Sequence, residues 1–198
     1  MITVGTGQAE GIETHTVVQA ALSQCREQLG DADPQAGIVF AGSHFDHQMM
    51  LDEIRHQFPK IELVGCTTAG DFSTNLGFSD DAITLMVFDS DDVEIKAGVG
   101  RNMNDDPTGA VKSAIDHARN RLSNPPTFGL AFPDGYDKRF DPIMKILNQE
   151  LGTACPVFGG AAGMQWTDSD KFLQFYNDEV LENAIPVSYT HLTLPTNR

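Results

Sequence analysis

The sequence predicts an α/β fold built from two copies of a β-α-β-α-β-β unit, which form a layered α/β sandwich with either one shared mixed sheet or two. Three observations carry this prediction. The motif Ile2-x-x-Gly5-x-Gly7 recurs 93 positions later as Ile95-x-x-Gly98-x-Gly100. An amphipathic helical pattern follows each copy, and short apolar segments then alternate with further helical patterns. Repetition at a fixed offset indicates an internal duplication, and alternating strands and helices indicate an α/β domain.

The first half covers about residues 1–91. After the opening strand, its predicted elements are a helix over residues 14–29, a strand over 37–41, a helix over 47–58, a strand over 61–70 and a strand over 82–89. The first helix is predicted from apolar residues spaced three and four apart, which gather on one face. Pro59 ends the second helix because proline cannot continue the backbone hydrogen bonding.

The second half, about residues 92–186, repeats the same order. Its predicted elements are a helix over residues 107–122, a strand over 128–132, a helix over 139–151, a glycine-rich segment over 155–163 and a final strand over 171–177. Gly152 is expected to end the second of these helices. The last strand of each half is predicted to pair antiparallel, because a short connection suits a hairpin.

Composition narrows the class of protein. The net charge of −15 disfavours nucleic acid and anionic membranes as partners. No apolar run approaches the ~20 residues that cross a bilayer, and the N-terminus lacks the pattern of a signal peptide. We therefore expect a cytoplasmic protein. The three widely spaced cysteines, Cys25, Cys66 and Cys155, argue against a disulfide framework and a zinc site. No cofactor or metal is predicted.

The C-terminal segment, residues 187–198, looks foreign to the rest of the chain. Its sequence, VSYTHLTLPTNR, resembles the translation of a transposon-end adapter used in sequencing libraries. We therefore exclude it from the predicted fold. The domain is expected to span residues 1–186, with a natural protein that continues beyond about Pro186.

Two glycine-rich turns are the candidate ligand site. In the first, Val64-Gly-Cys-Thr-Thr-Ala-Gly-Asp-Phe72, glycine permits close backbone approach and two threonines offer hydroxyls. Free backbone N–H groups in such a turn suit a carboxylate or a carbonyl. The alternative is a tight strand exit with a purely structural role. The second turn, Phe158-Gly-Gly-Ala-Ala-Gly163, lacks the hydroxyls.

Ligands of α/β folds sit at the carboxyl ends of strands, so the strand-to-helix turns at Ser43 and at Asp134 and Tyr136 could face the same pocket. The candidate ligand-binding residues are Ser43, Gly65, Cys66, Thr67, Thr68, Ala69, Gly70, Gly160 and Gly163.

Three more specific interpretations of the same residues have less support. The spacing from Gly65 to Gly70 fits a Walker A motif, but Asp71 and Phe72 stand where that motif needs Lys and Ser or Thr. Cys66 could act as a nucleophile with His44 or His47 as its base, although a buried thiol is the simpler interpretation. A metal site at His44-x-x-His47 lacks further ligands, and Asp46 between them is better explained as a helix cap.

These segments resemble the FIST N-terminal domain (F-box and intracellular signal transduction). The resemblance is carried by Gly37-Ile-Val-Phe-Ala, by Leu63-Val-Gly-Cys-Thr-Thr-Ala-Gly70, by Ala82-Ile-Thr-Leu-Met-Val-Phe88 and by Phe158-Gly-Gly-Ala-Ala-Gly163. It implies a sensory domain that binds a small molecule, such as an amino acid or a related metabolite. The family has no established catalytic residues that could be assigned to positions of this chain.

The resemblance also implies partners: a FIST C-terminal domain, missing here, and a signalling protein. It suggests a stand-alone protein of the bacterial type. Two other functions stay open at this point, namely an enzyme that uses Cys66 with a histidine base, and a protein-interaction module without a ligand.

Overall fold

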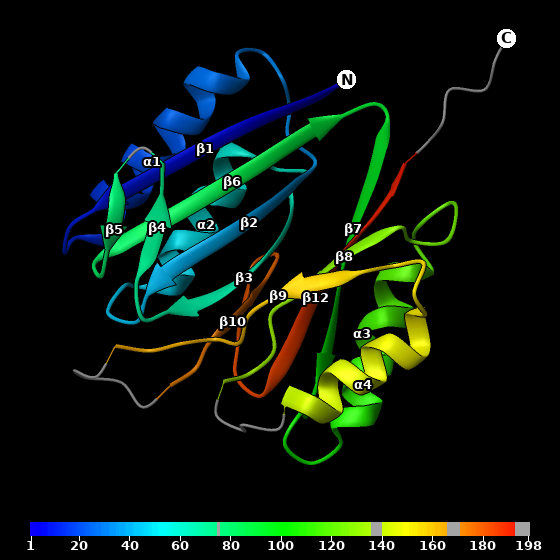
Figure 1. Ribbon diagram of the computed structural model, residues 1–198. Helices are drawn as coiled ribbons and strands as arrows, with labels where there is room; N and C mark the ends of the chain where they lie inside the picture. The colour runs from blue at the N-terminus through cyan, green and yellow to red at the C-terminus, as the bar shows by residue number, and fades with distance from the viewer. Residues whose placement is uncertain (75, 136–139, 166–170, 193–198) are drawn as a thin grey trace, which may run out of the picture.

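The computed structural model describes residues 1–74, 76–135, 140–165 and 171–192, and it contains two α/β units that follow each other in the chain (Figure 1). The first unit consists of β1 (Ile2–Glu10), α1 (Thr14–Leu29), β2 (Ala36–Gly42), α2 (His47–Gln57), β3 (Glu62–Thr68), β4 (Asp71–Ser73), β5 (Gly77–Ser79) and β6 (Ala82–Ser90). The second consists of β7 (Val93–Arg101), α3 (Pro107–Arg119), β8 (Phe128–Ala131), α4 (Phe140–Leu151), β9 (Val157–Gly159), β10 (Gln174–Tyr176), β11 (Glu179–Leu181) and β12 (Ala184–Leu192).

The strand order confirms the predicted α/β fold. The first sheet runs β1-β6-β2-β3-β10-β11 and the second runs β7-β12-β8-β9. In both units the last strand lies between the first strand and the second and pairs antiparallel with each of them. The second strand pairs in parallel with the third. Parallel and antiparallel pairs therefore mix in each sheet, and the two units share one topology.

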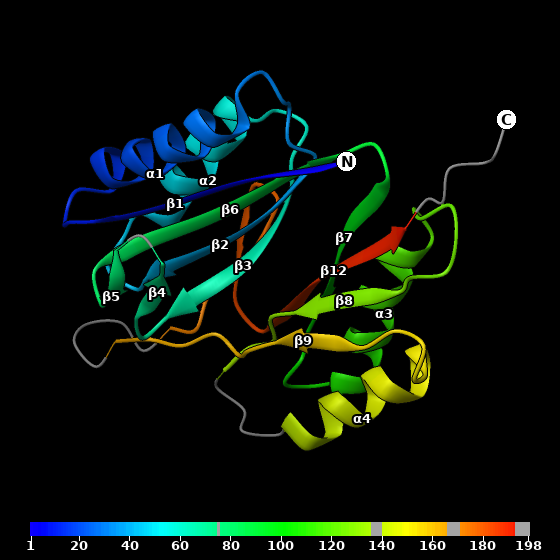
Figure 2. The same ribbon diagram turned by 45° about the horizontal axis from the view of Figure 1, so that its top comes forward.

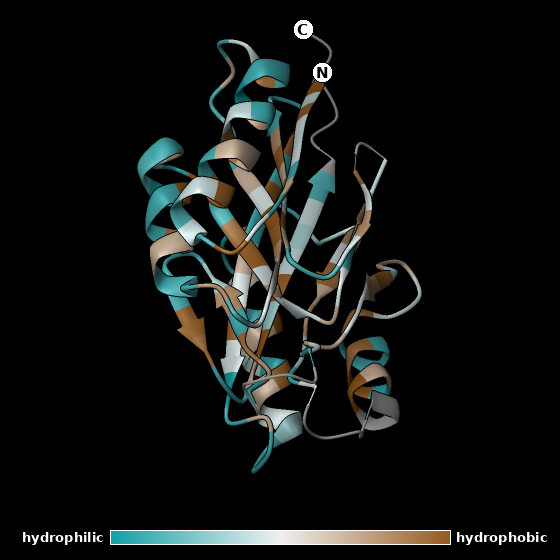
Figure 3. Cartoon of the chain, turned by 90° about the vertical axis from the view of Figure 1, so that its left-hand side faces the viewer, coloured by the Kyte–Doolittle hydropathy of each residue, from teal (hydrophilic) through white to brown (hydrophobic). Residues whose placement is uncertain are grey.

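The units pack as four layers, with helices outside and the two sheets facing each other (Figure 2). One apolar core fills the space between α1, α2 and the first sheet, and a second fills the space between α3, α4 and the second sheet. A third core joins the inner sheet faces through residues such as Val64, Val99 and Phe132. Hydrophilic residues predominate on the outer helices, and hydrophobic stretches lie along the strands (Figure 3).

Helix starts follow the sequence signals. Asp46 caps α2 by accepting a hydrogen bond from the Met49 N–H at 3.1 Å, as its position before the helix predicted. Asp106 caps α3 in the same way, through the Gly109 N–H at 2.8 Å. Among the described residues, no helix is both long and apolar enough to cross a membrane.

The repeat is real, but its register differs from the predicted one. Gly7 pairs with Leu85 in the first sheet, and an added Cβ there would overlap the Ala21 carbonyl of α1. Gly98 meets the Ala114 carbonyl of α3 in the same manner, so it takes the place of Gly7 rather than of Gly5. The loop between β7 and α3 is two residues longer than the loop between β1 and α1, which accounts for the shift.

The predicted last strand of the second half, residues 171–177, does pair antiparallel, but it is not the repeat counterpart of β6. The structural counterpart of β6 is β12, which lies between β7 and β8. Within the predicted strand, β10 instead pairs antiparallel with β3 of the first unit. The β10–β11 hairpin of the second unit therefore extends the sheet of the first unit.

Excluding residues 187–198 from the fold was also wrong for its first part. Val187 to Leu192 continue β12 through the middle of the second sheet. Tyr189 is fully buried there, which places the segment in the core. Residues 193–198 lie outside the described residues, and the foreign origin of the segment stays a prediction.

Candidate functional site

The two glycine-bearing turns meet at the junction of the units. The Gly163 N–H donates a hydrogen bond to the Thr67 carbonyl at 2.7 Å. A Cβ added to Gly163 would crowd the Ala69 backbone nitrogen, so glycine permits this close approach. The carboxyl ends of β3 and β9 therefore converge between the two sheets, which is the arrangement that a shared site requires.

An open cavity of about 440 Å³ lies beside this junction. The residues that line it are Ile38, Phe40, Cys66, Thr68, Leu130, Phe132, Gly159, Gly160 and Ala161. Phe40 and Phe132, one from each unit, meet edge to face with their ring centroids 5.4 Å apart. The walls are thus largely apolar and aromatic, and Thr68 contributes a hydroxyl and Cys66 a thiol. This composition is usual for a small-molecule site.

The predicted site residues divide into two groups. Cys66, Thr68 and Gly160 line the cavity. The others support it or lie nearby without lining it; these are Ser43, Gly65, Thr67, Ala69, Gly70 and Gly163. The turn at Ser43 follows β2, and Asp134 at the equivalent turn accepts a hydrogen bond from the Asn183 N–H. Tyr136 lies outside the described residues.

Thr67 has a structural role rather than a free hydroxyl. It is fully buried, and its hydroxyl accepts the Leu173 N–H at 3.0 Å. Its own N–H donates to the Leu173 carbonyl at 2.9 Å. These bonds hold the segment before β10 against β3. Gly65 permits close packing of a different kind, because a Cβ there would overlap the Val39 carbonyl of β2.

A buried polar cluster adjoins the cavity at Thr68. The Thr68 hydroxyl donates to Asp71 Oδ1 at 2.6 Å, and Asp71 is only 6% exposed. Burial raises the pKa of the Asp71 carboxyl, and the hydroxyls of Thr68 and Thr84 oppose that rise. The contact between the Asp71 carboxyl and the Thr84 hydroxyl is a weak one, because neither Asp71 Oδ2 nor Thr84 Oγ1 has a close hydrogen-bond partner among the described residues.

Gln8 extends this cluster across the sheet. It pairs directly with Thr84, and Thr84 pairs on its other side with Phe40 of the cavity wall. Gly7 faces α1, so Gln8 faces the opposite, inner side of the sheet. Its side chain is 3% exposed, and neither amide atom has a hydrogen-bond partner among the described residues. Such buried unsatisfied groups cost free energy unless something else pairs with them.

Reasoning from the sequence missed the aromatic walls and this polar cluster. Phe40 and Phe132 were assigned only to apolar strands. Asp71 was noted only as an argument against phosphate. One signal was present: Gln8 is a long polar residue that stands between Gly7 and Ala9 in the predicted opening strand. The pairing that places Gln8 beside Thr84 depends on strand order, which no local pattern reports.

The geometry does not favour Cys66 as a nucleophile. Cys66 is 2% exposed, and burial raises the pKa of its thiol to about 12, with Asp71 adding to the rise. His47 stacks 5.3 Å from Phe175, which belongs to the core beneath α1 and α2. Cys66 belongs to the core between the sheets. The thiol and this imidazole therefore lie on opposite faces of the first sheet.

The two histidines have other partners. The His47 ring lies 3.0 Å from the Gly42 carbonyl, and burial lowers its pKa. The His44 ring lies 3.4 Å from the Gly11 carbonyl and 3.8 Å from the Asp81 carboxylate. Across the described part of the chain, no three His, Cys, Asp or Glu side chains are grouped to hold a metal ion.

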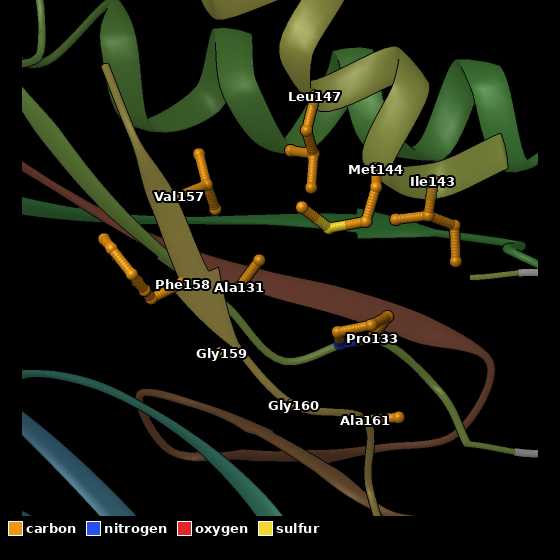
Figure 4. Close-up of a pocket in the computed structure, with 10 residues that line it drawn as sticks. All are labelled: Ala131, Pro133, Ile143, Met144, Leu147, Val157, Phe158, Gly159, Gly160 and Ala161. Atoms are coloured by element: carbon orange, nitrogen blue, oxygen red, sulfur yellow. The ribbon is translucent and has the colours of Figure 1, made fainter. Parts of the chain in front are cut away.

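A second hollow, of about 420 Å³, lies on the outer side of β9. Ile143, Met144 and Leu147 point into it from α4 toward the strands (Figure 4). It shares Gly159, Gly160 and Ala161 with the inner cavity. Its lining carries no polar side chain, so the inner cavity is the better candidate for a site that must orient a ligand.

Comparisons with known proteins match the chain to a family. The sequence profile of the FIST N domain matches residues 35–193. An uncharacterized protein of Methanocaldococcus jannaschii is 27% identical over 147 residues, which is 69% of this chain and 27% of that protein. The chain thus spans about a quarter of that relative. A crystal structure of cyanuric acid hydrolase from A. caulinodans aligns with 98% of this chain and 72% of its own, at 13% identity and a TM-score of 0.46.

Proposed function

This chain belongs to the FIST N domain family, whose members are sensory domains of signal transduction, and on that premise we propose that it binds a small molecule in the cavity between its two sheets. One observation carries the proposal. The glycine-bearing turns of both units converge on an open cavity of about 440 Å³ whose walls combine aromatic rings with a threonine hydroxyl.

The size and position of the cavity support a sensory role. Its volume falls within the range of about 300–1,000 Å³ that is typical of small-molecule sites. Residues of both units line it, so a bound ligand would contact both at once. A ligand changes a conformational equilibrium only through different contacts with the two states. A site at the junction can do so, because any shift of one unit against the other alters its walls.

For the ligand we propose an amino acid or a related metabolite, as the family resemblance implies. The partners in this proposal are a FIST C-terminal domain and a signalling protein that receives the output, and the setting is the cytoplasm. We propose binding without catalysis, because the buried Cys66 thiol and the separated His47 supply no activated nucleophile.

A specific observation favours an interaction module as the second candidate. Phe72 and Phe78 pair across the β4–β5 hairpin and are 73% and 67% exposed. Two large aromatic side chains exposed side by side are uncommon on a surface without a partner. The two functions are compatible, since the hairpin begins directly after the first glycine-bearing turn.

Isothermal titration against a panel of amino acids and related metabolites tests the proposal. The variant Gly160→Leu provides the site assignment: Gly160 lines the cavity, and a Cβ there meets no heavy atom within 4 Å, so a larger side chain is tolerated at its wall. Ser113→Leu adds the same side chain on exposed α3 as the matched control. We expect a ligand that binds the native protein and the control, and not the blocked variant. Binding that Gly160→Leu leaves unchanged would move the site elsewhere.

A further inference from the structure

The repeat contains one strand pairing that is made once where the topology offers it twice. The hairpin of the second unit joins the first unit, because β10 lies between β11 and β3. In the described part of the chain, the corresponding β4 of the first unit pairs only with β5, and β9, which corresponds to β3, pairs only with β8. Edge strands present backbone N–H and C=O groups that another strand can pair with. The chain therefore carries both halves of a second pairing of the same kind.

The two hairpins have the same register, and this shows which residues are equivalent. Phe72 lies opposite Phe78 in the first hairpin, and Phe175 lies opposite Val180 in the second, each as the middle one of three pairs. Phe175 is fully buried, and Val180 packs against the same core beneath α1 and α2. Phe72 and Phe78 are instead 73% and 67% exposed. The first hairpin thus shows on the surface the aromatic side chains whose equivalents fill a core.

The hollow on the outer side of β9 is the counterpart of the space that Phe175 fills. Phe175 lies opposite Gly65 of β3, and its ring centroid is 5.3 Å from that of His47 at the start of α2. In the second unit, α4 takes the place of α2, and Gly159 takes the place of Gly65, since a Cβ at either glycine would overlap the carbonyl of the neighbouring strand. Gly159 lines the hollow, and α4 contributes Ile143, Met144 and Leu147 (Figure 4).

The size and the lining of this hollow suit an aromatic side chain. Its volume is about 420 Å³, and its lining has no polar side chain. An apolar cavity of about 150 Å³ already holds a benzene ring, so a phenylalanine ring has room here. Met144 and Phe158 at the hollow are 43% and 60% exposed. Apolar surface is therefore exposed on both the hairpin and the hollow, and burying the two against each other is favourable.

We propose that the β4–β5 hairpin of one copy of this chain pairs with β9 of a second copy and inserts Phe72 into the hollow beneath α4. The register of β10 on β3 places Phe72 opposite Gly159 and Ser73 opposite Phe158. Within one molecule the hairpin and the hollow belong to different units and lie apart in both views (Figure 1, Figure 2). The hairpin that fills the hollow therefore comes from another copy.

This contact joins two different surfaces, so it leaves a free hairpin at one end of the pair and a free hollow at the other. Such heterologous contacts build closed rings or growing chains. The inference gives the interaction module a partner, and it does not depend on ligand binding, because neither Phe72 nor Met144 lines the inner cavity.

Sedimentation equilibrium of the native protein and of three variants with the same added charge tests the proposal. The runs cover roughly 5–500 µM protein in about 0.5 M NaCl, which screens the net charge of −15 on each copy. We expect the average mass of the native protein to rise beyond that of two copies. Phe72→Lys and Met144→Lys should each weaken association about hundredfold or more, because an unpaired ammonium opposes burial. Ser113→Lys, on exposed α3, should associate like the native protein.

Mixing the two weakened variants distinguishes this contact from a symmetric one. A Met144→Lys copy keeps an intact hairpin, and a Phe72→Lys copy keeps an intact hollow, so an equimolar mixture contains one functional contact. We expect the mixture to form dimers of the two variants and nothing larger. The rescue also shows that each variant is folded.

A disulfide tests the register. Ser73→Cys in one copy and Phe158→Cys in another should cross-link on mild oxidation, because two cysteines bridge only when their Cα atoms lie within about 7 Å. The native cysteines are buried. Ser113→Cys in place of Ser73→Cys is the control and should give no cross-link with Phe158→Cys above background.

Each arm can overturn the proposal. A native protein that stays monomeric over the whole range would do so, and it would leave ligand binding in the inner cavity as it stands. Undiminished association of Phe72→Lys or of Met144→Lys would also overturn it, as would a mixture of the two that stays monomeric. Equal cross-linking of the control and of the Ser73→Cys pair would overturn the pairing of β4 with β9.

Discussion

The two units share one topology but use their hairpins differently. In the first unit the β4–β5 hairpin forms its own two-stranded sheet and lies over the inner side of β6 and β2. In the second unit the β10–β11 hairpin leaves its own sheet and extends the first sheet beyond β3. Duplication thus provided two equal scaffolds. The hairpins between the third and last strands made them unequal, and the unequal parts are those that surround the cavity.

This difference gives the two glycine-bearing turns opposite surroundings. The first follows β3, which is paired on both sides, and it leads into the buried Asp71 cluster. The second follows β9, which lies at the edge of its sheet, and Phe158 beside it is 60% exposed. We infer that the first turn supplies the rigid, polar half of the site and the second supplies an apolar wall that can adjust. The predictions below test that contrast.

The largest expected change in the free energy of unfolding comes from a residue of β10, the strand that pairs with the outer edge of β3. Phe175 of β10 lies opposite Gly65 and is fully buried against the helices. Phe175→Ala should lower the free energy of unfolding by about 4 kcal/mol, because it leaves a large cavity. Phe158→Ala, at the open edge of the second unit, should change it by no more than about 0.5 kcal/mol. Urea unfolding followed by circular dichroism measures both, and equal losses would refute the contrast.

Glycine substitutions should give the next largest effect. A Cβ at Gly65 or at Gly159 would overlap the carbonyl oxygen of the paired residue on the second strand, Val39 or Ala131. Gly65→Ala should cost about 3 kcal/mol, because β2 and β10 hold β3 from both sides. Gly159→Ala should cost a similar amount for a different reason: β9 can move outward from β8 to relieve the overlap, but the φ of +149° at Gly159 is one that alanine rarely adopts. Urea titration measures both losses, and a loss below about 1 kcal/mol for Gly65→Ala would show that β3 can move as freely as the edge strand.

Removing one buried hydroxyl should lower the free energy of unfolding by a smaller amount. Thr67→Val keeps the shape of the side chain but removes the acceptor of the Leu173 N–H. An unpaired buried donor costs about 1–3 kcal/mol, and we expect a loss near the middle of that range. Hydrogen exchange of the Leu173 amide should become faster at the same time. Unchanged protection of that amide would mean that water or another acceptor replaces the threonine.

The fold could be predicted from the sequence further than the site could. Helical periodicity over residues 14–29 and the cap at Asp46 are local signals, and the structure confirms both. Which sheet β10 joins could not be predicted from local signals, because a strand of three residues can pair with any free sheet edge. The Asp71 cluster depends on that same long-range order. Gln8 and Thr84 lie 76 positions apart and become neighbours only through the pairing of β1 with β6.

Neutralising Asp71 should stabilise the protein modestly. Burial raises the pKa of this carboxyl in the folded state, so the ionised form is better tolerated in the unfolded chain. The destabilisation is absent below the unfolded pKa near 4 and grows as pH rises through the folded pKa. Asp71→Asn should therefore raise the free energy of unfolding by on the order of 1 kcal/mol at about pH 7 and leave it unchanged at about pH 3.

The control for this variant must separate Asp71 from its acidic neighbours. Glu10, held by the hydroxyl of Ser79 opposite Asp71, and Asp80 beside Gly70 are the nearby carboxylates on the adjoining elements. Asp116→Asn, remote on α3, should show no comparable gain between about pH 3 and pH 7. A loss of stability in Asp71→Asn at about pH 7 would show that the hydrogen bonds of the carboxylate outweigh the cost of its burial.

The smallest expected effect is an absence of reaction at Cys66. The equivalent position of the second unit is Gly160, so only the first turn carries a thiol, and an activated thiolate would be the strongest functional difference between the turns. Burial instead raises the pKa of Cys66 to about 12. Iodoacetamide at about pH 8.5, the ordinary thiol pKa, should leave Cys66 unlabelled in the native protein and label it fully in concentrated urea.

Mass spectrometry of the peptide that contains Cys66 distinguishes labelling of this thiol from labelling of Cys25 and Cys155, which are also buried. Rapid labelling of the native protein near neutral pH would make the first turn a reactive centre, and the catalytic alternative would then explain the contrast between the units better than ligand binding does.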